Sequence, residues 1–159
     1  MSAAEHEPTD RSATWAIFLT AKSLRAYFED RFASAGSSLA TYRTLDEIHR
    51  GGTRNQDQLA RAMGIEGATL TRHLDRMEAE RLIVRRRDPE DRRASLVEST
   101  AAGRRLHRRL REAARAADEE LWDGTSERER MRVRDVLAAV RENAHRITDE
   151  APSASGTRG

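Results

Sequence analysis

Residues 55–103 read NQDQLARAMGIEGATLTRHLDRMEAERLIVRRRDPEDRRASLVESTAAG, and this stretch decides the fold. Asn55 with Gln58 has the spacing of a capping box that begins a short helix. Thr53 with Gln56 offers the same spacing, so the start of that helix stays open between the two pairs. A glycine turn then leads into another helix, and the inward positions of the two helices are Leu59, Ala60, Met63, Leu70, Leu74 and Met77. The pattern predicts a helix-turn-helix.

A β-hairpin is predicted directly after these helices. Two β-prone runs, 82–87 and 94–99, flank a turn that contains a proline and Asp91. Arg92 and Arg93 follow the turn, near the tip of the arm. Arginines in such a place can enter a narrow, electronegative minor groove, and Asp91 can orient one of them. The alternative is a hairpin whose charges only keep it soluble.

Longer apolar stripes flank this unit on both sides. Spacings of three and four predict a helix over 14–32, and the residues 36–38 break it before a second helix that ends near Gly51. After the hairpin, Thr100 and Ser126 begin two further helices. These helices are too long for a small domain, so their stripes favour pairing with a second copy of the chain. The residues expected at that dimer interface are Trp15, Phe18, Leu19, Leu137 and Val140.

Arginine carries almost all of the positive charge. Of the 159 residues, 35% are charged and 4% are aromatic, which leaves little apolar material for an isolated monomer to bury. Lys22 is the sole lysine, and the net charge is +2. Between Arg54 and Arg109, fourteen arginines accompany nine acidic residues. This local excess is typical of DNA binding because guanidinium groups suit phosphates and base edges, although charge alone fits a solvated helical surface equally well.

The second helix of the helix-turn-helix has a clean division of faces. Its leucines and methionine face inward, so the polar side chains on and beside the other face are available to DNA. A major groove admits one α-helix, where arginine reads guanine and threonine contacts bases or phosphates. Arg72 is the expected main base reader, and the full set of expected contacts on this helix is Thr69, Thr71, Arg72, His73 and Arg76. The alternative is an ordinary amphipathic surface helix.

Several classes of function lack their residues in this sequence. There is no cysteine, so disulfides, thiolate metal sites and thiol redox sensing are excluded. No Gly-rich phosphate loop, His-Glu-x-x-His, Gly-x-Ser-x-Gly or pair of histidines at ligand spacing occurs, so we expect no enzyme, no cofactor and no metal. No apolar run approaches the ~20 residues of a membrane span, and the acidic, polar start differs from a signal peptide. A cytoplasmic protein without a membrane partner is expected.

The helix pair, followed by LIVR at 82–85, DPEDRR at 88–93 and TAAG at 100–103, resembles the MarR (multiple antibiotic resistance regulator) family over about residues 14–147. The resemblance implies a triangular homodimer held by N- and C-terminal helices. It implies that two winged helices read an inverted repeat and that a small ligand usually relieves repression. It also implies that the second helix of the pair enters the major groove, and that Arg93, supported by Asp91, enters the minor groove.

Two residues depart from the family pattern. Arg81 stands where the family commonly has glycine, so a left-handed cap there would be strained or differently built. Ser99 stands where a leucine usually precedes the threonine that begins the next helix. Neither departure removes a DNA contact, but both could loosen the attachment of the wing.

Family members often bind phenolic or other aromatic acids between the dimerisation helices and the winged helix. The residues of this chain that could line such a cleft are Phe28, Phe32, Tyr42, Arg43 and His49. The alternative for each aromatic residue is a place in the core, because aromatic side chains on helical stripes are core more often than pocket.

The predicted architecture is mainly α with a small β-hairpin wing. A winged helix-turn-helix DNA-binding domain spans 36–103, helical dimerisation regions span 12–35 and 104–148, and disordered tails span 1–11 and 149–159. The expected function is a transcriptional regulator, most simply a repressor that binds double-stranded operator DNA as a homodimer and is released by a small-molecule effector. The alternative is a ligand-independent architectural or protein-docking winged-helix DNA binder.

Overall fold

The computed structural model describes residues 12–52, 54–89 and 95–150. The chain forms two compact units, one that ends at Asp118 and one that begins at Glu119. The elements of the first unit are α1 (Ala13–Ser34), α2 (Leu39–Gly51), β1 (Arg54–Asn55), α3 (Gln56–Met63), α4 (Gly67–Ala79), β2 (Ile83–Arg87), β3 (Ser95–Ser99) and most of α5 (Ala101–Leu121). The second unit contains the end of α5 and α6 (Glu127–Glu150). The predicted mainly helical fold with a small β-hairpin is confirmed, and α6 continues two residues beyond the predicted boundary at residue 148.

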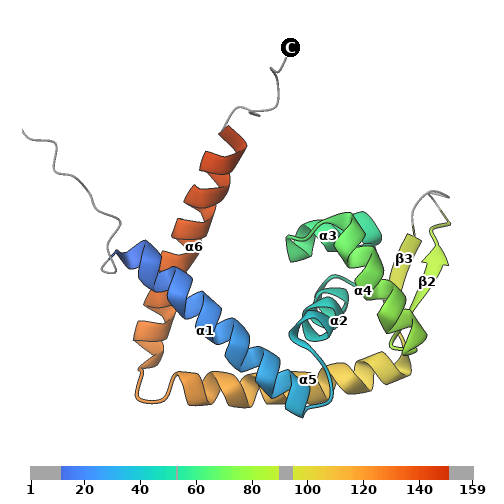
Figure 1. Cartoon of the computed structure of the whole chain (residues 1–159), viewed down its shortest axis with the longest axis horizontal. Coiled ribbons are helices and arrows are strands. Elements are labelled where there is room, and N and C mark those ends of the chain that lie inside the picture. The colour runs from blue at the N-terminus through green and yellow to red at the C-terminus, as the bar shows by residue number, and fades with distance from the viewer. Residues whose placement is uncertain (1–11, 53, 90–94, 151–159) are drawn as a thin grey trace, which may run out of the picture. The chain divides into compact units, whose positions relative to one another are not determined.

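One apolar core holds α2, α3, α4 and the sheet together. Figure 1 shows α3 and α4 beside α2, with the β2–β3 hairpin next to α4, and these elements are in contact. All six residues predicted to face inward from the helix-turn-helix are buried, and the whole core consists of Leu45, Ile48, Leu59, Ala60, Met63, Leu70, Leu74, Met77, Ile83 and Val97. Burying side chains of this size stabilises the fold by roughly 1.5–3 kcal/mol each for the larger ones. The helix-turn-helix therefore shares one core with α2 and the sheet.

The structure decides where α3 begins. The Asn55 side chain accepts a hydrogen bond from the Gln58 amide at 2.8 Å, and the Gln58 side chain accepts one from the Asn55 amide at 3.2 Å. This reciprocal pair is a capping box, one of the two alternatives that the sequence left open. The other alternative includes Thr53, which lies outside the described residues. At the far end, Gly64 closes α3 in the left-handed conformation at φ 64°.

The sheet has one strand more than the sequence predicted. β2 and β3 form the expected antiparallel hairpin, with Ile83 opposite Ser99 and Arg87 opposite Ser95. β1 adds two residues to the other side of β3, so the strand order is β1-β3-β2. Two residues carry too little alternation to be recognised as a strand, because a period of two needs a longer run to appear. β1 covers the edge of β3 directly before α3 begins.

The hairpin is joined to α4 and α5 at a tightly built junction. Arg81 has φ 58°, so of the two alternatives, a strained left-handed cap or a differently built one, the structure has the left-handed cap. The Thr100 amide donates to the Leu82 carbonyl at 3.0 Å, and the Thr100 hydroxyl accepts from the Gly103 amide at 3.0 Å. A Cβ on Gly103 would collide with the Leu82 carbonyl oxygen, so only glycine fits there. The segment that leads from α4 into β2 thus lies directly against the first turn of α5.

Large apolar side chains are exposed in both units. In the first unit, Trp15 and Phe18 of α1 are 46% and 58% exposed and stack with their ring centroids 5.3 Å apart. In the second unit, the exposed apolar residues of α6 are Met131, Val133, Val136, Leu137, Val140 and Ile147. Separately, none of the helices in the described ranges has the length and apolar character that crossing a membrane requires.

Replacing Arg81 by glycine should raise the free energy of unfolding by about 1 kcal/mol, because glycine adopts this backbone conformation without the steric cost that a Cβ imposes. Urea denaturation followed by circular dichroism measures the change. Arg81→Ala is the control, since it removes the long side chain but keeps the Cβ. Equal stability of the two variants would show that the left-handed backbone is not the source of the cost.

Candidate nucleic-acid interface

The two faces of α4 differ sharply in burial. Leu70, Leu74 and Met77 on the inner face are completely buried. The exposed residues on the rest of the surface between positions 68 and 79 are Ala68, Thr69, Arg72, Asp75, Arg76, Glu78 and Ala79. Small side chains at the start of the helix leave room for close approach of a groove wall, and arginine supplies donors for base edges. The arrangement has the form of a helix that enters a major groove.

Thr69 and Arg72 are the predicted contacts that lie most open on this face. Both are exposed, and no residue within the described ranges forms a hydrogen bond or ion pair with either side chain. Arg76 is also exposed, but its Nε lies 3.9 Å from the Glu80 carboxylate, a distance at which an exposed pair contributes little. Arg72 therefore offers a guanidinium that has no competing partner among the residues that the structure describes.

Thr71 has a structural contact that the sequence did not reveal. Its hydroxyl donates to the Gly67 carbonyl at 2.9 Å and accepts a hydrogen bond from the Gln56 side-chain amide. Gln56 begins α3 and Thr71 is the fifth residue of α4, so this bond joins the start of one helix to the second turn of the next. The Thr71 hydroxyl is thus engaged within the protein, and the side chain lies partly buried beside the exposed face.

His73 also faces the protein more than the solvent. The residue is only partly exposed, and its Nε2 atom is buried. Burial lowers the pKa of His73, because a charged imidazolium loses solvation there. The Nδ1 atom lies 3.5 Å from an Arg76 Nη2 atom on the next turn. A neutral His73 packed against the fold is less open to DNA than Thr69 and Arg72.

Arg85 is an additional residue at this interface that the sequence analysis did not single out. From β2 its Nη2 atom donates to the Asp75 carboxylate at 2.6 Å, and its backbone amide donates to the Glu78 carboxylate at 3.1 Å. The side chain is mostly buried at 20% exposure. Charge-assisted hydrogen bonds of this length are the stronger kind, so Arg85 holds α4 to the hairpin.

A signal for Arg85 was present in the strand. Alternate residues of a strand share a face, so Arg85 lies on the same side as Ile83, a core residue. An arginine on the buried side of a strand needs a partner. By contrast, the predicted wing-tip residues Asp91, Arg92 and Arg93 lie outside the described residues.

The sequence of this chain matches known proteins over the helix-turn-helix and beyond it. The model of the MarR family matches residues 35–94. The uncharacterized HTH-type transcriptional regulator YdgJ of Bacillus subtilis is 34% identical over 116 residues, which are 72% of this chain and 70% of that protein. The chain belongs to the MarR family.

Solved structures of MarR proteins share the fold. A MarR transcriptional regulator from Methanosarcina mazei matches with a TM-score of 0.74 at 24% identity, over 84% of this chain and 96% of that one. A mutant MarR from E. coli complexed with operator DNA matches with a TM-score of 0.74 at 19% identity, over 80% and 91%. PcaV from Streptomyces coelicolor, in complex with its natural ligand, matches with a TM-score of 0.70 at 21% identity, over 79% and 91%. The chain is thus a MarR-family transcriptional regulator with the winged-helix fold of these proteins.

In this MarR-family chain, three of the five predicted pocket residues meet at one cavity. Phe28, Phe32 and Tyr42 line a space of about 410 Å³ together with Leu39, Arg111, Ala114, Arg115 and Asp118. Phe32 stacks between Phe28 and Tyr42, with ring centroids 5.9 and 4.8 Å away. Burial, and then the nearby Asp46 carboxylate, raise the pKa of the Tyr42 hydroxyl, which keeps it a neutral hydrogen-bonding group.

The other two predicted pocket residues lie elsewhere. The Arg43 guanidinium donates to the Met63 carbonyl at 2.8 Å, so it joins α2 to the end of α3. His49 lines a different hollow with Glu98 and Arg104, and its ring lies 4.4 Å from the buried ring of His107. Within the described ranges, no group of three or more His, Asp or Glu side chains could hold a metal ion.

The buried position of His73 predicts a pH dependence of stability. In the unfolded chain His73 has its ordinary pKa of 6.5, and in the fold this pKa is lower. Above 6.5 both states are neutral, so the contribution of His73 is constant. As the pH falls below 6.5 the unfolded state takes up the proton first, and the free energy of unfolding decreases.

Urea denaturation at a series of pH values, from about 7.5 down to about 5, measures this decrease. His73→Gln should remove part of it, whereas His145→Gln, at an exposed position of α6, should retain the wild-type profile. Identical profiles for wild type and His73→Gln would contradict the prediction.

Proposed function

We propose that this chain is a homodimeric repressor that recognises an inverted-repeat operator through α4 and is released by a small aromatic acid. The observation that carries the proposal is the exposed face of α4, where Thr69 and Arg72 have no partner within the described ranges while the opposite face is locked in the core. Arginine that forms two hydrogen bonds to guanine is the commonest specific contact in a major groove. Arg72 is the residue to which we assign that role.

The operator is proposed to be an inverted repeat because two copies of the chain would each present one α4. The exposed apolar side chains Trp15, Phe18 and Leu19 of α1, and Leu137 and Val140 of α6, support a dimer, since each of them is more than 40% exposed in a single copy. Apolar faces of this kind are typical of subunit interfaces. A two-fold axis in the protein implies a two-fold axis in its DNA site.

Release by a small ligand is supported by the cavity at Phe28, Phe32 and Tyr42. Its walls are mainly aromatic and aliphatic, with Arg111 and Arg115 among its lining residues, so an aromatic ring and a carboxylate would each find a suitable neighbour. PcaV, which shares the fold, is known in complex with its natural ligand. From these walls alone we place the effector of this chain in the cavity at Phe28 and assign it the class of small aromatic acids.

Selection of bound DNA from a random library tests the proposal directly. The full chain should enrich an inverted repeat whose half-sites lie about one helical turn apart. Enrichment of no sequence, with binding that only follows salt concentration, would favour an architectural DNA binder instead.

Replacing Arg72 by alanine should reduce the preference for the selected operator over scrambled DNA by about tenfold or more, because one base contact of this type contributes about 1–3 kcal/mol of discrimination. Titrations at fixed salt measure both affinities. Arg128→Ala, at an exposed position of α6 opposite Leu137, changes the net charge equally and should retain the preference. Equal losses on both DNAs would assign Arg72 a phosphate contact and contradict the base-reading role.

Replacing Leu137 by glutamate should convert the dimer to monomer in sedimentation velocity, because a charge within the apolar face of α6 would be buried without a partner. Ala138→Glu is the matched control, since the rotation of about 100° per residue places residue 138 outside the apolar stripe that Val133, Leu137 and Val140 form on the same helix. A dimer that persists in Leu137→Glu at low micromolar concentration would exclude this face from the interface.

A further inference from the structure

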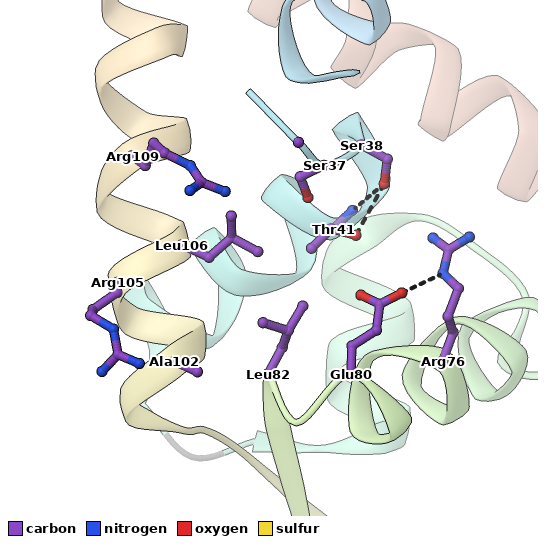
Figure 2. Close-up of a pocket in the computed structure, with 11 residues that line it drawn as sticks. Ser37, Ser38, Thr41, Arg76, Glu80, Leu82, Ala102, Arg105, Leu106 and Arg109 are labelled. Carbon is purple, nitrogen blue, oxygen red and sulfur yellow. Dashed lines mark hydrogen bonds and ion pairs between the residues drawn. The ribbon is translucent and has the colours of Figure 1, made fainter. Parts of the chain in front are cut away.

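A cavity separate from the aromatic one lies between the start of α2, the end of α4 and the start of α5 (Figure 2). Its volume is about 650 Å³, and it shares no lining residue with the cavity at Phe28. Figure 2 shows α5 on one side of the space and, on the other, Arg76 of α4 with Glu80, the residue that follows α4; Ser37 and Thr41 lie between them. The site lies entirely within the first unit.

The lining of this cavity is strongly positive. Arg76, Arg105 and Arg109 contribute three guanidinium groups, and Glu80 contributes one carboxylate, which gives a net charge of +2. Glu80 lies nearest to Arg76, with 3.9 Å between the charged atoms. Neither Arg105 nor Arg109 has a hydrogen bond or ion pair with any other residue in the described parts of the chain. Figure 2 shows the Arg109 guanidinium on the side of α5 that faces the space and the Arg105 guanidinium on the other side of the helix, so Arg109 is the group of α5 that is free to bind an anion there.

Arg109 is directed into the cavity. A Cβ on Gly36 would lie 3.6 Å from the Arg109 Nη2 atom, so the guanidinium reaches the turn that connects α1 to α2. The Ser37 hydroxyl is on the same turn, and it also has no hydrogen-bond partner among the described residues. A guanidinium and a hydroxyl that lie near the same turn can donate to different oxygens of one anion.

One wall of the cavity is apolar. Leu82, Ala102 and Leu106 line the side of the cavity at the junction of the hairpin with α5. In Figure 2 the side chains of Leu82 and Leu106 lie between Arg109 and Glu80. These side chains provide a surface for the carbon skeleton of a ligand, and the volume exceeds what a bare inorganic anion would fill.

We propose that this cavity binds a small phosphate monoester. A phosphate monoester carries nearly two negative charges at neutral pH, which matches the net charge of the lining. Its oxygens accept hydrogen bonds from the Arg109 guanidinium and the Ser37 hydroxyl. Its organic group packs on Leu82 and Leu106. Since Arg76 lies on the exposed face of α4, the bound anion competes for it with DNA phosphates, so ligand binding lowers operator affinity. This coupling rests on the proposed function of α4, whereas binding itself does not.

Isothermal titration of the full chain with phenyl phosphate, at constant ionic strength and about pH 8, tests the site without DNA. We expect saturable binding, weaker binding of inorganic phosphate because it lacks the ring, and a loss of about tenfold or more in Arg109→Gln. Arg108→Gln is the matched control, because residue 108 is exposed on the same helix and does not line the cavity. Circular dichroism of both variants verifies that they fold like the wild type.

The site is overturned if neither compound binds at concentrations up to about 10 mM, or if Arg108→Gln loses as much affinity as Arg109→Gln. Operator titrations with and without phenyl phosphate then test the coupling, which should disappear in Arg109→Gln. Binding of phenyl phosphate with unchanged operator affinity would refute the coupling and retain the site. Failure of the chain to select any operator would refute the proposed function, and the titration would still decide whether the site exists.

Discussion

The complete burial of one face of α4 is the constraint on which the rest of the structure depends. Leu70, Leu74 and Met77 are removed from solvent by α2, α3 and the sheet, so this helix cannot rotate about its axis without exposing them. Each such side chain stabilises the buried arrangement by roughly 1.5–3 kcal/mol. The orientation of the opposite face, with Thr69 and Arg72, follows from this packing. The surface that has to be complementary to DNA is thereby preorganised in the free protein.

The arginines of this chain divide into two structural groups. Arg43 and Arg85 are used inside the fold, where they bind a backbone carbonyl and a pair of carboxylates. Arg72 and Arg109 have no partner in the described ranges and face an exposed helix surface and a cavity. Arginine therefore forms structural contacts at some positions and remains available to bind a ligand at others. Which role applies depends on whether a carboxylate or carbonyl lies within reach.

Much of the fold was predictable because it rests on local rules. The 3.6-residue period placed the six inward residues of the helix-turn-helix correctly. The departure from the family's glycine at Arg81 left two alternatives, a strained left-handed cap or a differently built one, and the structure has the left-handed cap. β1 was missed because two residues show no period. The capping choice at Asn55 stayed open because both candidate pairs have the same spacing, and only three-dimensional contacts separate them.

The candidate site was less predictable, because it depends on contacts between segments far apart in sequence. Thr71 and His73 were expected to face DNA from their places on the helix, but Gln56 engages the first and the fold buries part of the second. Arg43 and His49 lie near Tyr42 in sequence, but their side chains reach other parts of the fold. Helical periodicity indicates only roughly which face of the helix a side chain lies on. Which residue the side chain then contacts depends on the tertiary structure.

The clamp at Arg85 has a consequence for how DNA would have to adapt. Because Arg85 fixes β2 to Asp75 and Glu78, the helix and the base of the hairpin behave as one stiff body. A rigid DNA-binding surface cannot adjust its shape to the groove, so the double helix has to deform. The energy of this deformation depends on how easily each base step bends. Base pairs that no side chain touches would then contribute to selectivity through their mechanical compliance.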